Sequence, residues 1–310
     1  MIIDISRKQV ALGLTIILFI LALLLYRYIF NNNNERSQHL DNETLCGEML
    51  SWDEVNKVFP KYAKAKVIDV DTRLSFQIQR RGGSRHADVQ PLTSNDTAIM
   101  KSIYSGKWSW KRKAVIIELD SGKRIAASMN GMPHGQGAIE NDFDGHFCIH
   151  FKDCKTHGSN KVDLAHQMMI WKSANMLDDH FQTLGPEDII AVFFIAIDQQ
   201  ELNIVSKLLN TEVNVKPLLK NLEMIESIKI DKIKNIEGNT FSVDIRMVYK
   251  DTNREFRKNI SINTTEKMPY WKIDANSIIP LFDKNTWVTL DQISNNTWEE
   301  EDLEVDVIME

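Results

Sequence analysis

The sequence predicts an α+β protein with an N-terminal transmembrane helix, a β-rich domain, and a C-terminal domain made of a helix and an antiparallel sheet. Three observations support this fold class. An uncharged apolar run extends from Val10 to Tyr26. Short runs of strand-like composition are frequent between Ala65 and Phe151. A long helical segment followed by alternating runs then occupies residues 185–283.

Residues 1–30 are expected to form the anchor. The run Val10–Tyr26 is longer than the ~7–15-residue core of a signal peptide, and no A-x-A cleavage site follows it, so an uncleaved anchor is favoured over a signal peptide. Because few residues precede the span, we expect a single-pass cell-membrane protein whose domains are extracytoplasmic. Residues 31–44 are polar and lack periodicity, which is typical of a linker.

Composition limits the classes of function. The 310 residues leave room for two domains, and 43% hydrophobic with 26% charged residues is typical of a folded chain. A net charge of -6 argues against a nucleic-acid partner. The three cysteines are an odd number, so they do not form a full disulfide framework. Cys148 with Cys154, or Cys46 with Cys154, remain possible pairs.

The β-rich domain is expected to span residues 45–181. Ser51 and Glu54 form a capping-box pattern before a short helix. A second helix is expected over Ser94–Tyr104, capped by Ser94 or Asn95. Strands are expected at 65–70, 74–79, 113–119 and 124–130, the last two joined by a hairpin turn at 120–123. Residues 161–177 have helical spacing of apolar positions.

The C-terminal domain is expected to span residues 185–283. Pro186 favours the first turn of one long helix through residue 209, and four alternating runs ending at Asp274 follow it. This layout resembles the nuclear-transport-factor-2-like and cystatin-like α+β domains. We assign this domain no chemistry. Residues 284–310 form an acidic tail, expected to be solvated.

Candidate chemistry gathers in the strand-like segment Gly145–Phe151. Alternation along a strand places His146, Cys148 and His150 on one face and aromatic and aliphatic residues on the other. A thiol flanked by imidazoles is a candidate nucleophile. Upstream, His134 is the candidate base, and the amides of Gly135 and Gly137 are candidates for holding an oxyanion.

These residues resemble the L,D-transpeptidase signature, an HG pair followed after a loop by S-H-G-C-[IV]-R. The chain has His134-Gly135 and then the segment GHFCIH at 145–150. The resemblance implies a β-rich catalytic domain that acts on peptidoglycan stem peptides. Cys148 would be the acylated nucleophile, His134 its base, and His146 the histidine that orients or polarises the pair.

The chain departs from that signature at three positions. Gly145 replaces Ser or Thr, Phe147 replaces Gly, and His150 replaces the Arg, so that His150 takes the substrate-binding position. Other segments, among them RRGGSRHADVQPLT and AASMNGMPHG, resemble an uncharacterised domain of secreted or anchored proteins of spore-forming bacteria. That likeness supports a bacterial cell-wall context.

Two alternatives remain open. A zinc-dependent cell-wall peptidase would draw its ligands from His86, His134, His146 and Cys148, with His157 or Asp88 as further candidates. A non-catalytic cell-wall-binding module would need none of this chemistry. Three other histidines, His157, His166 and His180, are expected at the surface or on a helix face, and His39 in the linker. The tryptophans Trp108, Trp110 and Trp171 are expected in the core.

Overall fold

The computed structural model describes residues 45–156, 161–210, 215–252, 254–282 and 288–289. The predicted anchor, the linker, His39, His157 and most of the acidic tail lie outside these residues. Within them, no helix has the length and apolarity that crossing a membrane requires. The longest, α6 (Pro186–Asp198), has 13 residues. At about 1.5 Å per residue it is shorter than the ~30 Å hydrocarbon core of a bilayer.

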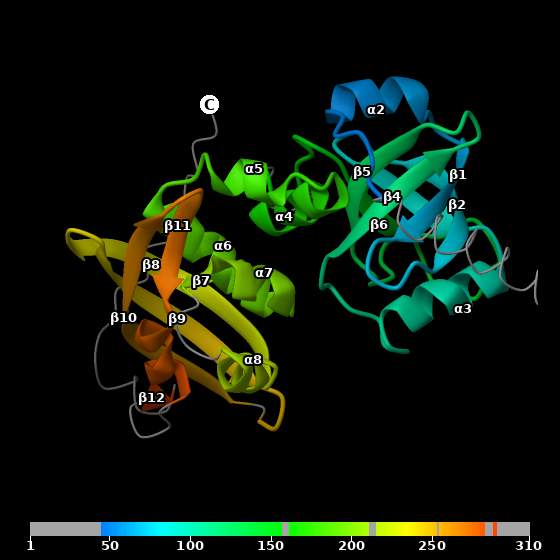
Figure 1. Ribbon diagram of the computed structural model, residues 1–310. Coiled ribbons are helices and arrows are strands. Elements are labelled where there is room, and N and C mark those ends of the chain that lie inside the picture. Colours follow the sequence, from blue (N-terminus) through cyan, green and yellow to red (C-terminus); the bar gives the residue numbers. More distant parts are fainter. Residues whose placement is uncertain (1–44, 157–160, 211–214, 253, 283–287, 290–310) are drawn as a thin grey trace, which may run out of the picture. The chain divides into compact units, whose positions relative to one another are not determined.

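This finding goes against the predicted fold class with its transmembrane helix and against the predicted single-pass membrane localisation, whereas the membrane partner stays a prediction. The structure is an α+β fold made of a closed six-stranded barrel and a second, six-stranded sheet. Figure 1 shows the two sheets in sequence colours, the barrel strands from blue to green and the second sheet in yellow and orange.

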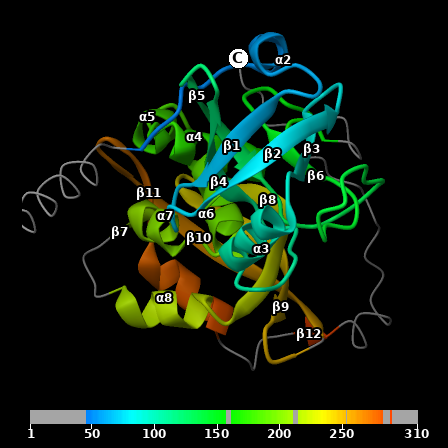
Figure 2. The same cartoon turned by 90° about the vertical axis from the view of Figure 1, so that its right-hand side faces the viewer.

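The barrel closes in the strand order β1-β2-β3-β6-β5-β4, and Figure 2 shows its β1 and β2 side by side. Each pair of neighbours is antiparallel. The strands are β1 (Lys64–Asp69), β2 (Ser75–Gly82), β3 (Ala87–Pro91), β4 (Lys113–Leu119), β5 (Arg124–Met129) and β6 (Phe147–His150). Five of the six were predicted from alternation or apolar runs. The sequence reading missed β3, which is short and ends in proline.

Local sequence signals place the barrel helices. In α2 (Trp52–Val58), Ser51 N and Oγ both donate to Glu54 Oε2, at 2.9 and 2.7 Å, which agrees with the predicted capping box. The helix α3 (Ser94–Ile103) begins where it was predicted, but its N-cap is Thr93 and not Ser94 or Asn95, since Thr93 Oγ1 accepts from the Asp96 amide. Asp163 caps α4 (Leu164–Ser173) through the amides of Ala165 and His166.

The second sheet follows the predicted strands closely. Its order is β7-β11-β10-β9-β8, with β12 paired to β10. The strands are β7 (Leu209–Asn210), β8 (Ile225–Glu237), β9 (Thr240–Tyr249), β10 (Glu255–Lys267), β11 (Tyr270–Asp274) and β12 (Val288–Thr289). The helix α6 packs against β8. This sheet and the helices α5 (Leu177–Phe181) and α8 (Lys216–Leu222) contribute to one hydrophobic core.

The single long helix predicted after Pro186 is two helices. The first is α6, and α7 (Leu202–Leu208) follows it. Gln200 adopts a positive φ of 62°, which an α-helix does not contain, and the chain turns there. The apolar run alone did not reveal this break. A 3₁₀ helix, η1 (Ala275–Phe282), ends the continuously described part of the domain.

Two hydrophobic clusters form the core of the described residues. One fills the barrel and includes Phe147, Ile149 and Phe151 from β6 and the residue after it. The predicted apolar face of this strand is therefore confirmed. The other cluster belongs to the second sheet and also takes in Met168, Met169 and Trp171 of α4. The opposite face of β6 carries the candidate chemistry.

Candidate functional site

The barrel brings the predicted base and thiol together. His134 forms a β-bridge with His146, in which the His134 amide donates to His146 O at 3.0 Å and the His146 amide donates back at 2.8 Å. Cys148 lies two residues further along this segment, on the same face as His146. This register places Nε2 of His134 3.1 Å from Sγ of Cys148.

The tautomer of His134 follows from its second ring nitrogen. Nδ1 lies 2.9 Å from the Met132 carbonyl oxygen, which can only accept a hydrogen bond. Neutral His134 therefore carries its proton on Nδ1, and the lone pair of Nε2 faces the thiol. A base held in this way can accept the Sγ proton without first rotating.

Asp88 is a site residue that the sequence reading did not place beside the thiol. It lies directly across from Cys148 in the β3–β6 ladder. Its Oδ1 is 3.9 Å from Cys148 Sγ and 3.9 Å from His146 Nε2. The missing signal was β3 itself, because pairing of β3 with β6 is what turns the carboxylate toward the thiol.

The glycine-containing loop packs on His146. A Cβ on Gly135, whose φ is +63°, would come within 2.3 Å of the imidazole ring, so this position excludes any side chain. Gln136 O lies 3.2 Å from Nδ1 of His146, which directs Nε2 of that ring to the interior of the site. The predicted oxyanion-holding role of the Gly135 and Gly137 amides stays a prediction.

Burial governs the protonation of the thiol. Cys148 is 4% exposed. Burial raises the pKa of the Cys148 thiol well above its ordinary value. The negative charge of Asp88 and the hydrogen bond from the thiol to this carboxylate raise the pKa further. The resting pair is therefore a neutral thiol beside an imidazole, and it becomes a nucleophile when His134 removes the proton.

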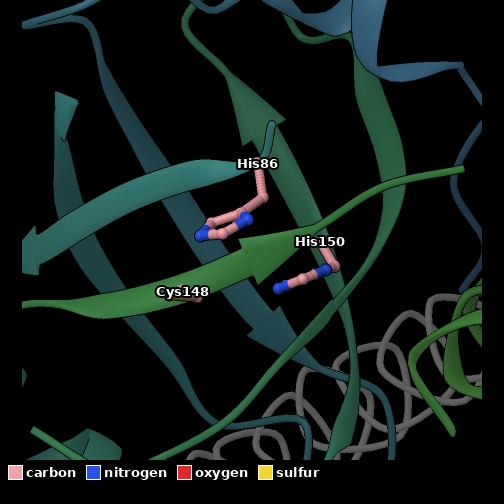
Figure 3. Close-up of side chains that lie close together, drawn as sticks. All are labelled: His86, Cys148 and His150. Atoms are coloured by element: carbon pink, nitrogen blue, oxygen red, sulfur yellow. The ribbon is translucent and has the colours of Figure 1, made fainter. Parts of the chain in front are cut away.

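Behind the thiol, three imidazoles stack in a column. The His86 and His150 rings are 4.4 Å apart at 16°, and the His150 and His166 rings are 3.8 Å apart at 9°. Figure 3 shows His86 where β3 begins and His150 near the end of β6. His166 Nδ1 lies 2.9 Å from Ser128 Oγ, and all three histidines are buried.

This column corrects two predictions. His166 lies on α4, as one of the two predicted placements had it, but it is not a surface residue, since it is 3% exposed where α4 packs on β5. His150 does not fit the substrate-binding role, because burial and the neighbouring rings lower its pKa far below 6.5 and keep it neutral. A neutral, enclosed imidazole does not attract a substrate carboxylate. His180, half-buried against Trp171, takes no part in the site.

The other cysteines stay apart from the chemistry. All three cysteines are free thiols, so neither of the two possible pairs is joined in this structure. Cys154 is 1% exposed and its Sγ accepts from the Phe151 amide at 3.1 Å. Burial raises the pKa of the Cys154 thiol to about 12. Cys46 is exposed.

The surface near the site is aromatic. Trp110 is 53% exposed, and its ring lies 5.3 Å from that of His134. This exposure corrects the prediction that Trp110 belongs to the core, whereas Trp171 is buried. Cavities of about 380 and 300 Å³ lie in the second-sheet domain, and neither is lined by site residues. The walls of these two cavities bring together no set of reactive groups comparable to that at Cys148.

The predicted metal ligands form two overlapping groups. His86, Cys148 and His150 place one ligand atom each within 4.8 Å of one another, and so do His134, His146 and Cys148. The predicted set His86, His134, His146 and Cys148 is thus divided between the two groups. Both contain the same sulfur, which therefore cannot serve two ions in these positions independently.

Comparison with protein-family models and with curated proteins found no match to this chain.

Proposed function

We propose that the barrel carries a thiol acyl-transferase or amidase site of the L,D-transpeptidase type, with peptide carbonyls of peptidoglycan stem peptides as substrate. The observation that carries the proposal is the 3.1 Å contact between Nε2 of His134 and Sγ of Cys148, with Nδ1 held by a carbonyl. A nucleophile, a base and a group that orients the base are the minimum for covalent acyl transfer.

The resemblance in sequence supports the same assignment of roles. His134, His146 and Cys148 match the L,D-transpeptidase signature by position, and the bridge between His134 and His146 brings the two motif halves together. Phe147, which replaces the signature glycine, points into the barrel core, so it does not occupy the space around the thiol. This departure is therefore compatible with the proposed chemistry.

The reaction would proceed in two transfers. Sγ of Cys148 attacks the carbonyl carbon while its proton passes to Nε2 of His134, and a C–S bond forms. The tetrahedral intermediate then breaks its C–N bond, and His134 returns the proton to the leaving amine. An acceptor amine, or water in the amidase case, attacks the thioester and releases the thiol, with His134 again carrying the proton.

Substrate has to approach an enclosed thiol. Cys148 is 4% exposed, whereas the neighbouring Trp110 is 53% exposed. A peptide can therefore pack on Trp110 and reach the sulfur after a small displacement of the His146 ring, whose side chain is 18% exposed. The amides of Gly135 and Gly137 are the proposed donors to the oxyanion.

Acylation of the purified full-length chain tests the proposal. A carbapenem, which acylates nucleophilic thiols of this family, is expected to add its mass to the wild-type chain and to Cys154→Ala but not to Cys148→Ala. Peptide mapping should place the adduct at Cys148. Cys154 is a matched control because it is also a buried thiol in the same region. Equal labelling of Cys148→Ala and wild type would refute the assignment, as would equal processing of muropeptides by the two proteins.

A further inference from the structure

The four side chains around the thiol have donor atoms of the kinds that bind zinc. Zinc in proteins takes thiolate, imidazole and carboxylate ligands in tetrahedral geometry. Cys148, His134, His146 and Asp88 supply one sulfur, two nitrogens and one oxygen. Three contacts define the arrangement: 3.1 Å from His134 Nε2 to Cys148 Sγ, 3.9 Å from Asp88 Oδ1 to that sulfur, and 3.9 Å from Asp88 Oδ1 to His146 Nε2.

These separations suit a tetrahedral ion. Bonds of ~2.0–2.3 Å at tetrahedral angles place neighbouring ligand atoms about 3.3–3.8 Å apart. Each of the three contacts lies within about 0.5 Å of that range. The ligand atoms of His134, His146 and Cys148 all lie within 4.8 Å of one another, so these side chains have to move closer together to complete the coordination. A single ion also needs no cavity, which fits a sulfur that is 4% exposed.

The hydrogen bonds made by the second ring nitrogens of His134 and His146 also favour metal binding. Histidines that bind metals generally donate their second ring nitrogen to a carbonyl or carboxylate. His134 Nδ1 meets Met132 O at 2.9 Å and His146 Nδ1 meets Gln136 O at 3.2 Å. Both rings therefore present Nε2 to the thiol. His86 Nε2 lies 3.3 Å from Asp88 Oδ1.

Ring orientation favours the group that contains His134 and His146 over the group that contains His86 and His150. The His86 and His150 rings lie nearly parallel, 16° apart and face to face. Lone pairs in the planes of stacked rings run side by side and do not meet at one point. The His134 and His146 rings are tilted by 59° with centroids 4.6 Å apart, so that their lone pairs can converge.

We propose that Cys148, His134, His146 and Asp88 bind one zinc ion, which holds the thiol as a zinc thiolate. Binding forms the Zn–S bond and releases the Sγ proton to solvent. The same ion occupies Nε2 of His134, so the zinc-bound protein has neither a free nucleophile nor a free base. The binding itself does not rest on the proposed acyl transfer, although it would control it.

Equilibrium dialysis of the chelator-treated full chain against zinc tests the binding. We expect a single ion per chain, and cobalt(II) in its place should give thiolate charge-transfer absorption in the near ultraviolet. Cys148→Ser, His146→Ala and Asp88→Asn should each weaken zinc binding by about tenfold or more. His150→Phe and Cys154→Ser are matched controls and should bind as wild type does. Circular dichroism of each variant checks that it is folded.

The outcomes are distinguishable. Zinc binding that is unchanged in Cys148→Ser and His146→Ala overturns the site, and loss of binding in His150→Phe but not in His146→Ala transfers it to the stacked group and overturns the proposed ligand set. Carbapenem acylation is measured separately in excess chelator and in excess zinc. If the chain binds zinc but is not acylated in chelator, the acyl-transfer proposal is contradicted and the zinc site is not. If the chain is acylated in chelator and equally acylated at zinc concentrations that saturate the site, the proposed zinc site is contradicted and the acyl-transfer proposal is not.

Discussion

In the second sheet, burial alternates residue by residue along β9 and much of β10, whereas β6 of the barrel is buried at every position. A half-covered sheet leaves its polar face in water, where polar side chains need no partner. A strand covered on both faces has to satisfy every polar group that it carries. The barrel meets this demand at Cys148, which His134 and Asp88 contact from neighbouring segments, but not at His150, whose buried Nδ1 has no hydrogen-bond partner among the described residues.

The difference extends to the buried polar groups. Between β1 and β6 the barrel buries Asp69, Arg80, His86, Gln90, Asp96, Thr97, Ser128, Asn130, Asn141 and His150. Strands β8 to β11 bury two polar side chains, Lys258 and Thr264. The second sheet therefore serves mainly to bury apolar surface, while the barrel holds ionisable groups in fixed positions. The predictions below separate these two roles.

Changing the base should have the largest effect. His134→Gln keeps a side chain of similar size but removes the proton acceptor, so acylation at Cys148 should slow by about 10²–10⁴-fold. His180→Gln is the matched control, because His180 stacks on Trp171 outside the site and should not alter the rate. Rates are followed by intact mass spectrometry with carbapenem in excess chelator. Equal rates for His134→Gln and wild type would remove His134 from the mechanism.

Two phenylalanines test whether stability and chemistry are separable. Phe147 in β6 and Phe194 in α6 are both almost fully buried. Truncation of either to alanine should lower the free energy of unfolding by about 3–5 kcal/mol. Phe147→Ala should also slow acylation, since Phe147 adjoins Cys148 on the same strand, whereas Phe194→Ala should leave it intact in the folded fraction. Urea denaturation and labelling rates measure the two effects. Slower labelling in both variants would show that the second sheet also shapes the site.

The sequence predicted most strands because their alternation is a local property. The same alternation correctly placed Phe147 and Cys148 on opposite faces of β6. His134 was predicted as the base from its place in the glycine-containing segment upstream of the strand, and the resemblance agreed with it. What local pattern does not contain is the partner across a ladder. Asp88 became a site residue because β3 pairs with β6, and β3 has neither the length nor the alternation to be recognised.

Two further errors have similar causes. The apolar run after Pro186 continues through the break between α6 and α7, so periodicity alone did not indicate a turn at Gln200. His166 was expected at the surface or on a helix face, and it lies on α4 but is buried. Its burial depends on Ser128, which lies 38 positions earlier in the chain and supplies the hydrogen-bond partner. Non-local contacts of this kind decide which polar residues a fold can enclose.

The buried imidazole of His166 makes the smallest prediction, and it concerns pH. Burial, with the positive charge of Arg112 next, holds the pKa of His166 well below 6.5 in the folded chain. The unfolded chain gains a proton on this ring as pH falls below 6.5, and the folded chain does not. The stability that neutral His166 permits is therefore complete above this pH and is lost progressively as the solution becomes more acidic, by up to about 1.4 kcal/mol per pH unit.

His166→Gln removes this proton uptake while keeping a polar group near Ser128 Oγ. The variant should be less stable than wild type at about pH 7.5, and the difference should narrow by about 1–2 kcal/mol at about pH 5. Urea denaturation at both pH values measures it. Lys207→Gln in α7 is the control variant. It changes a residue of the second-sheet domain, in which no described residue after His180 is a histidine. A difference between His166→Gln and wild type that is constant across this range would mean that folded His166 takes up its proton as the unfolded chain does, because only an imidazole kept neutral by burial couples folding to pH in this direction.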